Sequence, residues 1–294
     1  MIHEPLYLCG TTASGKSACA CAIAEKMGGE IINADAFQLY QGLEVLTASP
    51  NEHEQSQAPH FLYNAAALTE KLDAARYEAL ARPIIAEVQS RGKIPLIVGG
   101  SGLYLKFLTH GCAPAPPGDE KIRAELDQLT VDEIYRRLKN LDPEEAARQN
   151  SQNRRHLGRA LEICLITGSK ASDLRKNFAI PENTAHLKGI VLQWPREILA
   201  NRIAQRTAQM LENGAIEEVK NLPTNSGTVR QAIGVREIEA HLRGELSREE
   251  CLERITISTR QYAKRQRNWF RREHWLTPID GSKGIDSILT SLPI

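Results

Sequence analysis

The segment from Gly10 to Ser17 constrains the fold of this chain more than any other. It reads GTTASGKS and matches G-x-x-x-x-G-K-[ST], directly after an apolar run at Leu6–Cys9 and before an Ala-rich helical segment at Ser17–Met27. In this context the glycines allow a loop whose backbone N–H groups converge on phosphate oxygens at a helix N-terminus. Lys16 adds a positive charge, and the Ser17 hydroxyl can hold Mg²⁺. The predicted site for a diphosphate or triphosphate comprises Gly10, Thr11, Thr12, Ala13, Ser14, Gly15, Lys16 and Ser17.

Strand and helix signals alternate after this loop. The β-like segment Glu30–Ala34 runs into Asp35, Glu70–Ser90 reads as a helix, and the apolar run Ile94–Val98 leads into a glycine turn. This alternation predicts an α/β fold with a P-loop NTPase-like parallel sheet covered by helices. Ligands of such sheets bind beyond the carboxyl ends of the strands. Here those ends are Gly10, Asp35 and Gly99.

A Pro-rich break divides the chain. Residues 112–118 read CAPAPPG, and the charged segment from residue 119 to about 178 has helical patterns, before the strand-like His186–Gln193. We therefore expect the first part of the P-loop core at 1–118 and an inserted all-helical domain at 119–185. Residues 186–294 are expected to return to the core and to form helices, first to about Leu222 and then to about Glu273.

Composition excludes several classes of protein. Of 294 residues, 41% are hydrophobic and 25% charged, which is typical of globular chains and not of disordered ones. The 37 basic and 36 acidic residues give a net charge of +1, so basic character is local at most. Six cysteines show no zinc-ligand spacing, which favours core residues of a reduced, cytoplasmic protein. No stretch approaches the ~18 apolar residues of a membrane span.

Two strand ends carry candidate catalytic groups. Asp35 is a candidate general base or a ligand of Mg²⁺ through water, although a turn-capping aspartate is the simpler alternative. The second strand end reads VGGSGLY, where glycines allow close approach of the backbone to a ligand and Ser101 presents a hydroxyl. This strand lacks the terminal aspartate of a Walker-type ATPase, which argues against a motor or switch.

A basic helix is expected near the C-terminus. Seven basic and no acidic residues lie between Arg254 and Arg272. Arg260, Lys264, Arg267 and Arg271 fall on one helical face, and Ile255, Tyr262 and Trp269 form a separate stripe expected to pack inward. The basic face suits nucleic-acid phosphates, with a solvated charged surface as the alternative. Arg202 and Arg206 are candidates for covering a bound diphosphate or for plain surface charges.

Together these segments resemble the tRNA dimethylallyltransferase family, also called tRNA isopentenyltransferases or IPP transferases. The family's D-S-x-Q-x-Y is DAFQLY at 35–40, and its R-G-[LM]-[DE]-[IV]-G-T-A-K-P is QGLEVLTASP at 41–50. VGGSGLY, RRHLGRALE, RQAIGV and TRQYAKRQRNWFR follow at 98–104, 154–162, 230–235 and 259–271. The matches run in order across nearly the whole chain, which makes the set far more specific than the phosphate loop alone.

The resemblance implies a reaction. Such enzymes transfer a dimethylallyl group from dimethylallyl diphosphate to N6 of the adenosine 3′-adjacent to the anticodon of tRNA, which forms N6-isopentenyladenosine and diphosphate. A nucleotide-binding loop of the ATP-binding type would then grip the leaving group. It implies that Asp35 accepts the N6 proton and that Ser101, at the position of a family Thr, donates to the diphosphate. Lys16, Ser17 with Mg²⁺, and Arg230 would neutralise that group.

The resemblance also implies the partners, which are the tRNA anticodon stem-loop and dimethylallyl diphosphate. We expect a monomer that does not bind a membrane. Gln38 would hold the target base, and Arg123 occupies the position of a family tRNA contact. The implied tRNA-binding residues are Asp35, Ala36, Phe37, Gln38, Arg123, Arg155, His156, Arg159, Arg260, Lys264, Arg265, Arg267 and Arg271.

Five positions depart from the family pattern. Ala36 replaces Ser, Leu46 and Ser49 replace Gly and Lys, His156 stands where Arg is usual, and Val235 replaces an aromatic residue. The chemistry is expected to be intact while the grip on substrate differs. Three alternatives stay open: an adenylate isopentenyltransferase acting on free AMP, ADP or ATP, a P-loop kinase of a small molecule, and an inactive RNA-binding relative.

Overall fold

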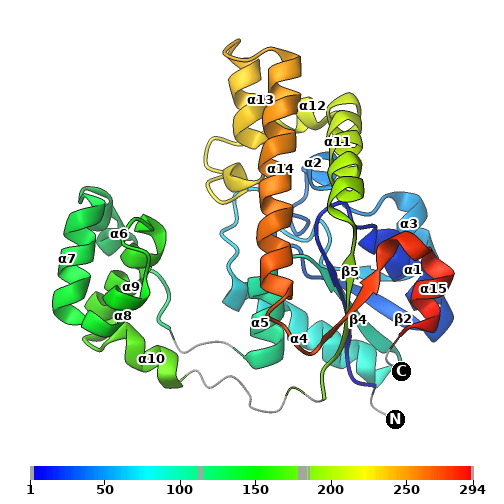
Figure 1. Ribbon diagram of the computed structural model, residues 1–294, viewed down its shortest axis with the longest axis horizontal. Helices are drawn as coiled ribbons and strands as arrows, with labels where there is room; N and C mark the ends of the chain where they lie inside the picture. The colour runs from blue at the N-terminus through cyan, green and yellow to red at the C-terminus, as the bar shows by residue number, and fades with distance from the viewer. Residues whose placement is uncertain (1–2, 112–114, 178–183, 185, 293–294) are drawn as a thin grey trace. The chain divides into compact units, whose positions relative to one another are not determined.

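The computed structural model describes residues 3–111, 115–177, 184 and 186–292. The chain forms two compact units (Figure 1), one of residues 1–109 with 184–294 and one of residues 110–183. We call them the core and the insert. The sequence analysis placed the boundaries at 119 and 185. Residues 112–114 of the Pro-rich break lie outside the described residues.

The core contains a six-stranded sheet with the order β3-β2-β4-β1-β5-β6, and all its pairs are parallel. The prediction of a parallel α/β sheet is therefore confirmed. β5, the strand that follows the insert, pairs with β1 from Leu6↔Lys188 to Gly10↔Leu192, so the chain returns to the centre of the sheet. The strands are β1 Leu6–Gly10, β2 Gly29–Asn33, β3 His60–Phe61, β4 Ile94–Gly99, β5 Lys188–Gln193 and β6 Leu276–Asp280.

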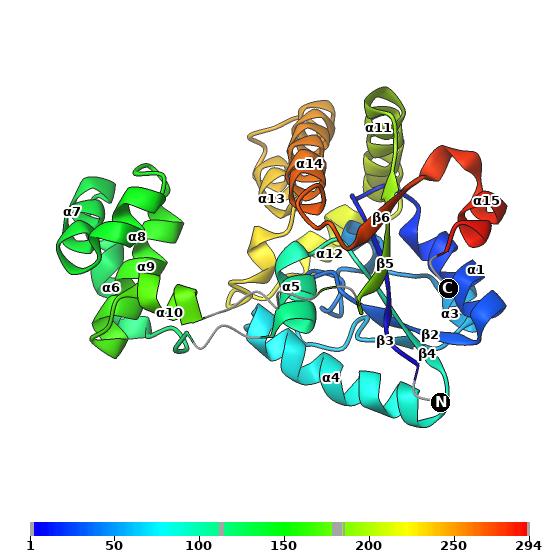
Figure 2. The same ribbon diagram turned by 60° about the horizontal axis from the view of Figure 1, so that its bottom comes forward.

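Helices cover both faces of this sheet (Figure 2), and alternate residues of each strand enter two different cores. Tyr7 and Cys9 of β1 join one core, while Leu6 and Leu8 join the other. Strands buried on both faces explain the continuous apolar runs of the sequence. The core helices are α1 Lys16–Met27, α2 Glu44–Thr47, α3 Glu52–Gln57, α4 Ala74–Ser90, α5 Gly102–His110, α11 Arg196–Glu212, α12 Ala215–Lys220, α13 Val235–Leu242, α14 Arg248–Phe270 and α15 Ile285–Thr290, with short 3₁₀ turns at η1 Val229–Gln231 and η2 Gly281–Lys283.

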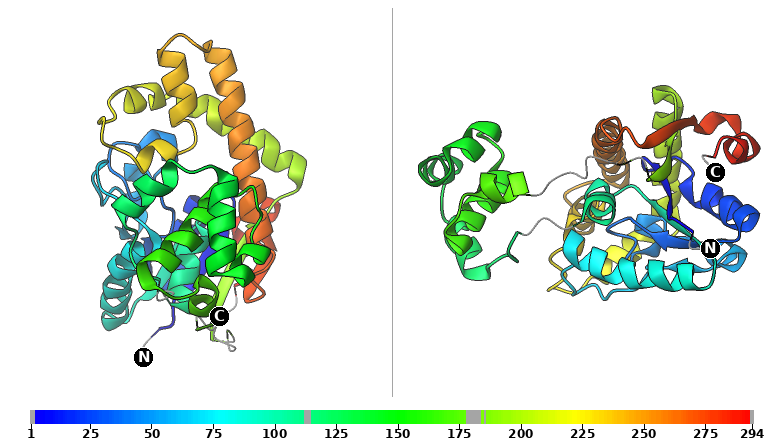
Figure 3. Two further views of the ribbon diagram at one scale, coloured as in Figure 1. Left: turned by 90° about the vertical axis from the view of Figure 1, so that its left-hand side faces the viewer. Right: turned by 90° about the horizontal axis from the view of Figure 1, so that it is seen from below.

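The insert is helical throughout its described residues (Figure 3), as the sequence predicted. Several of its helices begin at side-chain caps, of which Thr130 and Glu133 form a complete capping box. Ile134, Leu138, Leu157 and Leu161 belong to a buried core of its own. Its helices are α6 Glu120–Asp127, α7 Val131–Leu141, α8 Pro143–Arg148, α9 Arg154–Thr167 and α10 Ala171–Asn177.

Some element bounds differ from the sequence prediction. The helix expected from Glu70 begins only at Ala74, because the Asp73 side chain accepts the Arg76 amide and caps it there. The helix expected up to about Leu222 is broken into α11 and α12 at Gly214, which has φ 110°. The five described cysteines are buried and free, as predicted, while Cys112 lies outside the described residues. Within the described part of the chain, we find no helix that is long and apolar enough to cross a membrane.

Candidate active site

A cavity of about 600 Å³ lies at the carboxyl ends of the central strands. It gathers the phosphate loop, the end of β2, the segment after α2 and one side of α11. Its lining includes Thr12, Ala13, Ser14, Gly15, Lys16, Ser17, Asp35, Gln38, Thr47, Ala48, Ser49, Arg202 and Arg206. The sequence motifs at residues 10–17 and 35–38 therefore meet in one site, as parallel strand ends should.

The phosphate loop has the backbone that an anion site needs. Gly15 lies at φ 85°, in the left-handed region that favours glycine, and α1 starts at the next residue without a side-chain cap among the described residues. The first amides of α1 are therefore open to an anion. Lys16 Nζ donates to the carbonyl oxygens of Gly10 and Thr11 at 3.1 and 2.9 Å. Burial lowers the pKa of Lys16 to about 8, against the opposing effect of the Asp35 carboxylate.

One polar group of the loop lacks a partner. The Ser14 hydroxyl is buried, and within the described part of the chain it neither donates nor accepts a hydrogen bond. A buried polar atom without a partner is costly, so a ligand oxygen at this point would remove a penalty. This observation fits a bound phosphate group.

Asp35 is held in place through its backbone by Asn33. The Asn33 side chain accepts the Asp35 amide at 2.7 Å and donates to the carbonyls of Asp35 and Leu62 at 3.1 and 2.8 Å. Tyr77, also buried, donates to the Asn33 carbonyl at 2.8 Å. The Asp35 carboxylate accepts the Phe37 amide at 3.2 Å through Oδ1, and the side chain lines the cavity. The Asp35 carboxylate thus makes a turn contact and is also partly accessible in the cavity that Lys16 lines.

Ser101 stands behind the start of this turn. Its Oγ accepts the Ala36 amide at 2.9 Å, and its own amide donates to the Ala34 carbonyl at 3.2 Å. A Cβ at Gly99 would lie 2.1 Å from that same carbonyl oxygen, so only glycine allows β4 to approach β2 this closely. The cavity lining includes Asp35 but not Ser101. Ser101 therefore contacts the residue that follows Asp35 but does not itself line the cavity.

Gln38 shapes the opposite wall of the cavity. Its amide nitrogen donates to the carbonyls of Thr47 and Ala48 at 3.2 and 2.8 Å, which fixes the end of α2 beside the phosphate loop. The two amide protons are thus engaged, and the carbonyl oxygen is the group left to meet a substrate.

Two arginines of α11 close the site on its other side. Arg206 donates to Thr12 Oγ1 and to the Thr47 carbonyl, both at 3.0 Å. Arg202 donates to the Ala13 carbonyl at 2.8 Å and stacks on Trp194, 4.2 Å from the ring centre. Of the two sequence interpretations for these arginines, the one that places them at the phosphate site fits their contacts.

Arg230 does not line this cavity, and its assignment to the diphosphate stays a prediction. Its guanidinium pairs with Glu239 of α13 and donates to the Pro223 carbonyl at 3.2 Å, and the cavity lining does not include it. The reason is local: Arg230 sits on the short turn η1, and the acidic partner on the next helix holds it there. Arg206, which the sequence left ambiguous, supplies a cation that lines the cavity.

The oxygen groups of the cavity fit Mg²⁺. Ser17 and Asp35 both line it, and Mg²⁺ prefers one or two protein oxygens together with waters and substrate phosphates. The described residues contain no group of three or more His, Cys, Asp or Glu side chains able to hold a metal by themselves. A cation here would therefore depend on a phosphate ligand for part of its coordination.

Helix α14 has the two faces that the sequence predicted. Ile255 is buried and Tyr262 and Trp269 are half-buried, whereas Arg260, Lys264, Arg265 and Arg271 are exposed and Arg267 is partly so. Arg265 also lies over the Tyr262 ring, 5.7 Å from its centre. Arg260, Lys264, Arg267 and Arg271 share one helical face, which suits phosphate contacts.

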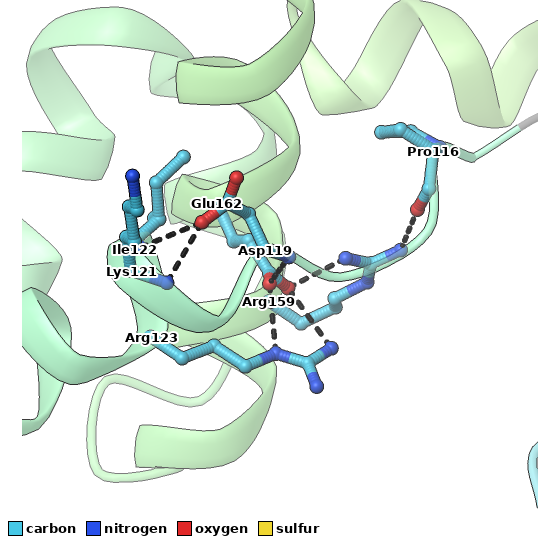
Figure 4. A network of polar contacts seen from close by, with 7 residues as sticks. All are labelled: Pro116, Asp119, Lys121, Ile122, Arg123, Arg159 and Glu162. Carbon is cyan, nitrogen blue, oxygen red and sulfur yellow. Dashed lines mark hydrogen bonds and ion pairs between the residues drawn. The ribbon is translucent and has the colours of Figure 1, made fainter. Parts of the chain in front are cut away.

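The predicted tRNA contacts of the insert fall into two groups, one exposed and one engaged in ion pairs. Arg155 and His156 are exposed at the start of α9, whereas Arg123 and Arg159 bind Glu162, which is only 2% exposed (Figure 4). Glu162 pairs with them at 2.7 and 2.5 Å and accepts the Asp119 amide at 2.9 Å. Arg159 also donates to the Pro116 carbonyl at 2.5 Å. Arg123 and Arg159 therefore join the first residues of the insert to α9, and only their remaining N–H groups are free for RNA.

Two departures from the family pattern meet in the core. A Cβ at Gly234 would lie 2.9 Å from Leu46 Cδ1, so Leu46 packs directly against Gly234, beside the buried Val235. Leu46 and Val235 are thus both buried members of one core cluster.

Comparisons with known proteins agree on one family. Residues 38–273 match the family model described as IPP transferase. The chain is 40% identical to the tRNA dimethylallyltransferase of Akkermansia muciniphila over 277 residues, which cover 94% of this chain and 93% of the relative. It is 38% identical to that of Geobacter metallireducens over 291 residues, 96% and 94% of the two chains.

Solved structures give the same result. The tRNA isopentenylpyrophosphate transferase of Bacillus halodurans is 31% identical with a TM-score of 0.71, covering 99% of this chain and 95% of its own. A eukaryotic dimethylallyltransferase, solved acting on tRNA, is 29% identical with a TM-score of 0.78, covering 95% and 74%. On the family model and on these relatives, the chain belongs to the IPP transferase family.

Proposed function

We propose that this protein is a tRNA dimethylallyltransferase, which transfers a dimethylallyl group from dimethylallyl diphosphate to N6 of the adenosine 3′-adjacent to the anticodon. The observation that carries the proposal is the meeting of a phosphate loop and the Asp35 carboxylate in a single cavity, which Glu54 also lines. A phosphate loop alone suits many reactions, but a carboxylate facing it suits a step in which diphosphate leaves while a proton is taken up.

The atoms balance in a single displacement. The adenine N6 attacks C1 of the allyl group, a C–N bond forms, the C1–O bond breaks, and diphosphate leaves with the bond electrons. Asp35 takes the proton released by N6, a contribution of typically about 10²–10⁴-fold for a positioned base. Lys16, Arg202 and Arg206 are the cations that line the cavity and neutralise the leaving group.

Mg²⁺ bound to the diphosphate would supply additional positive charge there, with Ser17 as its protein oxygen. Ser101 stabilises the backbone next to Asp35 by accepting the Ala36 amide, and its hydroxyl proton is the donor that the family resemblance assigns to the diphosphate. The target base must leave its stack to reach the cavity, and the carbonyl of Gln38 is an acceptor for its amino group.

The exposed stripe of α14 is the surface for the tRNA backbone in this proposal. Phosphate contacts by arginine and lysine give salt-dependent binding, which sets the register of the RNA without reading its sequence. Arg155 and His156 extend the set from the insert. We expect the protein to act in the cytoplasm as a monomer.

A transfer assay tests the proposal. The protein is mixed with Mg²⁺, labelled dimethylallyl diphosphate and unmodified tRNA that carries adenosine 3′ of the anticodon, with AMP as acceptor in a parallel reaction. Label in tRNA is the expected result. Label in AMP alone would favour an adenylate isopentenyltransferase, and phosphate transfer from ATP to a small acceptor would favour a kinase.

Asp35→Asn separates catalysis from binding. Asparagine keeps an oxygen that can accept the Phe37 amide, so the turn persists, but it takes up no proton. We expect a heavy loss of turnover at unchanged tRNA affinity. Near-normal turnover would remove Asp35 from the role of base.

A further inference from the structure

A glutamine of α14 joins the two strand ends that form the site. Gln266 is only 5% exposed. Its Oε1 accepts the Thr12 amide of the phosphate loop at 2.8 Å, and its Nε2 donates to the Gly100 carbonyl at 2.9 Å. Thr12 follows β1 and Gly100 follows β4, and these strands are neighbours in the sheet. One side chain thus sets the spacing between the phosphate loop and the turn that carries Ser101.

Its neighbours on α14 hold the rest of that turn. Burial, the largest effect, raises the pKa of the Tyr262 hydroxyl, and the nearby side chains of Ser101 and Gln266 oppose this shift. A Cβ at Gly102 would lie 2.4 Å from the Trp269 ring, so the indole packs directly on this glycine. Residues 262, 266 and 269 therefore lie on one stripe of the helix and contact residues 100–102.

These contacts explain the glycines of the turn. The sequence suggested that they allow a ligand to approach the backbone, but a Cβ at Gly100 would lie 2.2 Å from Gln266 Nε2. The space next to Gly100 is thus occupied by the side chain of Gln266. The glycines accommodate α14, and the close fit leaves the helix little freedom relative to the turn.

We propose that Gln266 is a positioning residue of the transferase site, which holds the phosphate loop and the Ser101 turn at the separation needed to grip diphosphate. This inference rests on the proposed function for the identity of the reaction, but the grip on diphosphate is testable without it. Glutamine suits the task because one side chain offers both an acceptor for Thr12 and a donor for Gly100.

The position of Gln266 also links two parts of the site. At 3.6 residues per turn, Tyr262, Gln266 and Trp269 point about 180° away from the basic stripe of α14. The face that holds the catalytic turn and the face offered to tRNA phosphates thus belong to the same rigid helix. A change at Gln266 alters the first face and leaves the charges of the second unchanged.

Two variants break the link from opposite sides. Gln266→Met keeps the side-chain length but removes both hydrogen bonds, and Gly100→Ala puts a methyl group where Gln266 Nε2 lies. Gln261→Met is the matched control, because Gln261 is exposed on the same helix. Each protein is compared with the wild type for its affinity for inorganic diphosphate with Mg²⁺, its affinity for tRNA, its kcat, and amide hydrogen exchange of segments 9–17 and 98–104.

We expect Gln266→Met and Gly100→Ala to weaken diphosphate binding about 5- to 10-fold. We expect kcat to fall about 10- to 100-fold, because a misplaced site loses near-attack geometry. Exchange should accelerate in the two segments only, while tRNA affinity stays that of the wild type. Gln261→Met should match the wild type in every measurement.

Two results would overturn the proposal. Unchanged diphosphate affinity and unchanged exchange in Gln266→Met would show that the two hydrogen bonds do not position the loop. A parallel loss of tRNA affinity, or faster exchange along all of α14, would show a general role in docking the helix. If the wild type labels no tRNA, the proposed function fails, but diphosphate affinity and hydrogen exchange still decide the role of Gln266.

Discussion

Arg206→Met tests whether α11 forms part of the diphosphate site. The Arg206 guanidinium has five N–H groups, and its hydrogen bonds to Thr12 Oγ1 and the Thr47 carbonyl use two of them, which leaves three for other partners or the cavity. Burial lowers the pKa of Arg206, although Asp35 opposes this effect, so the cation lies in a poorly hydrated place. Charge–charge attraction is strong in such surroundings because water screens it less.

The size of the effect follows from these contacts. A hydrogen bond to a charged group is worth about 1.5–3 kcal/mol, and each 1.4 kcal/mol changes an equilibrium constant about tenfold. The dissociation constant for inorganic diphosphate should therefore rise about 10- to 150-fold in Arg206→Met. Stability should change little, because Thr12 Oγ1 and the Thr47 carbonyl border the cavity and can bind water there.

Titration calorimetry at fixed ionic strength and fixed Mg²⁺ measures this constant. Arg206→Lys should recover only part of the affinity, since a lysine keeps the charge and loses the planar fork. Arg196→Met, in the exposed first turn of α11, is the control for a lost positive charge. An affinity of Arg206→Met within about twofold of the wild type would refute the assignment of Arg206 to the site.

Three further changes test the fold, the insert and the RNA surface. Gly99→Ala should cost about 3 kcal/mol or more in unfolding free energy, measured by urea titration, because its Cβ would lie 2.1 Å from the Ala34 carbonyl oxygen. Glu162→Gln should destabilise the insert by about 1.5–3 kcal/mol at neutral pH. Burial by itself would raise the pKa of Glu162. Hydrogen bonds from two arginines and one amide together lower it by more, so the net pKa lies below the ordinary 4.5. The stabilisation by the Glu162 carboxylate is present above pH 4.5 and is lost as the pH falls towards the lowered pKa. The difference in stability between the wild type and Glu162→Gln should therefore shrink on acidification. Hydrogen exchange of α9 measures this difference. Arg267→Ala should weaken tRNA binding and reduce the slope of log K against log salt by about one unit.

Each of these predictions has a control and a contrary result. Gly227→Ala, with open space around the added methyl group, should leave stability nearly unchanged, and a soluble, equally stable Gly99→Ala would contradict the packing argument. A Glu162→Gln difference that stays constant down to pH 3 would mean that the carboxylate charge is unimportant. For tRNA binding, Arg196→Ala should keep the wild-type salt slope, and an unchanged slope in Arg267→Ala would exclude this side chain from the interface.

The parts of the site that sequence could predict are those built from neighbouring residues. The phosphate loop and Asp35 follow buried strands directly, and apolar runs that end in glycine or a polar residue mark strand ends reliably. Since parallel strand ends share one edge, their meeting in one cavity required no knowledge of distant contacts. The two faces of α14 were predictable for the same reason, because helical periodicity is a local property.

The parts that sequence could not predict depend on partners far away in the chain. Arg230 forms an ion pair with Glu239 of the next helix, and no sequence pattern indicated this partner. Arg123 and Arg159 looked like free RNA contacts, but the buried Glu162 engages both. A guanidinium follows the best carboxylate within reach, and the sequence alone does not place that carboxylate.

Gln266 shows most clearly what sequence alone cannot predict, because a polar residue in a basic helix can be either exposed or buried. In the sequence it is a polar residue of a basic helix, and one would expect it to face solvent or RNA. Its partners Thr12 and Gly100 lie 254 and 166 positions away, and only the docking of α14 on the strand ends brings them together. Gly100 and Gly102 are the only local indication of this contact, since glycines in a turn allow another group to pack closely against the backbone. That close contact is with Gln266 and Trp269 of α14, so the helix that carries the exposed basic residues also packs on the turn after β4.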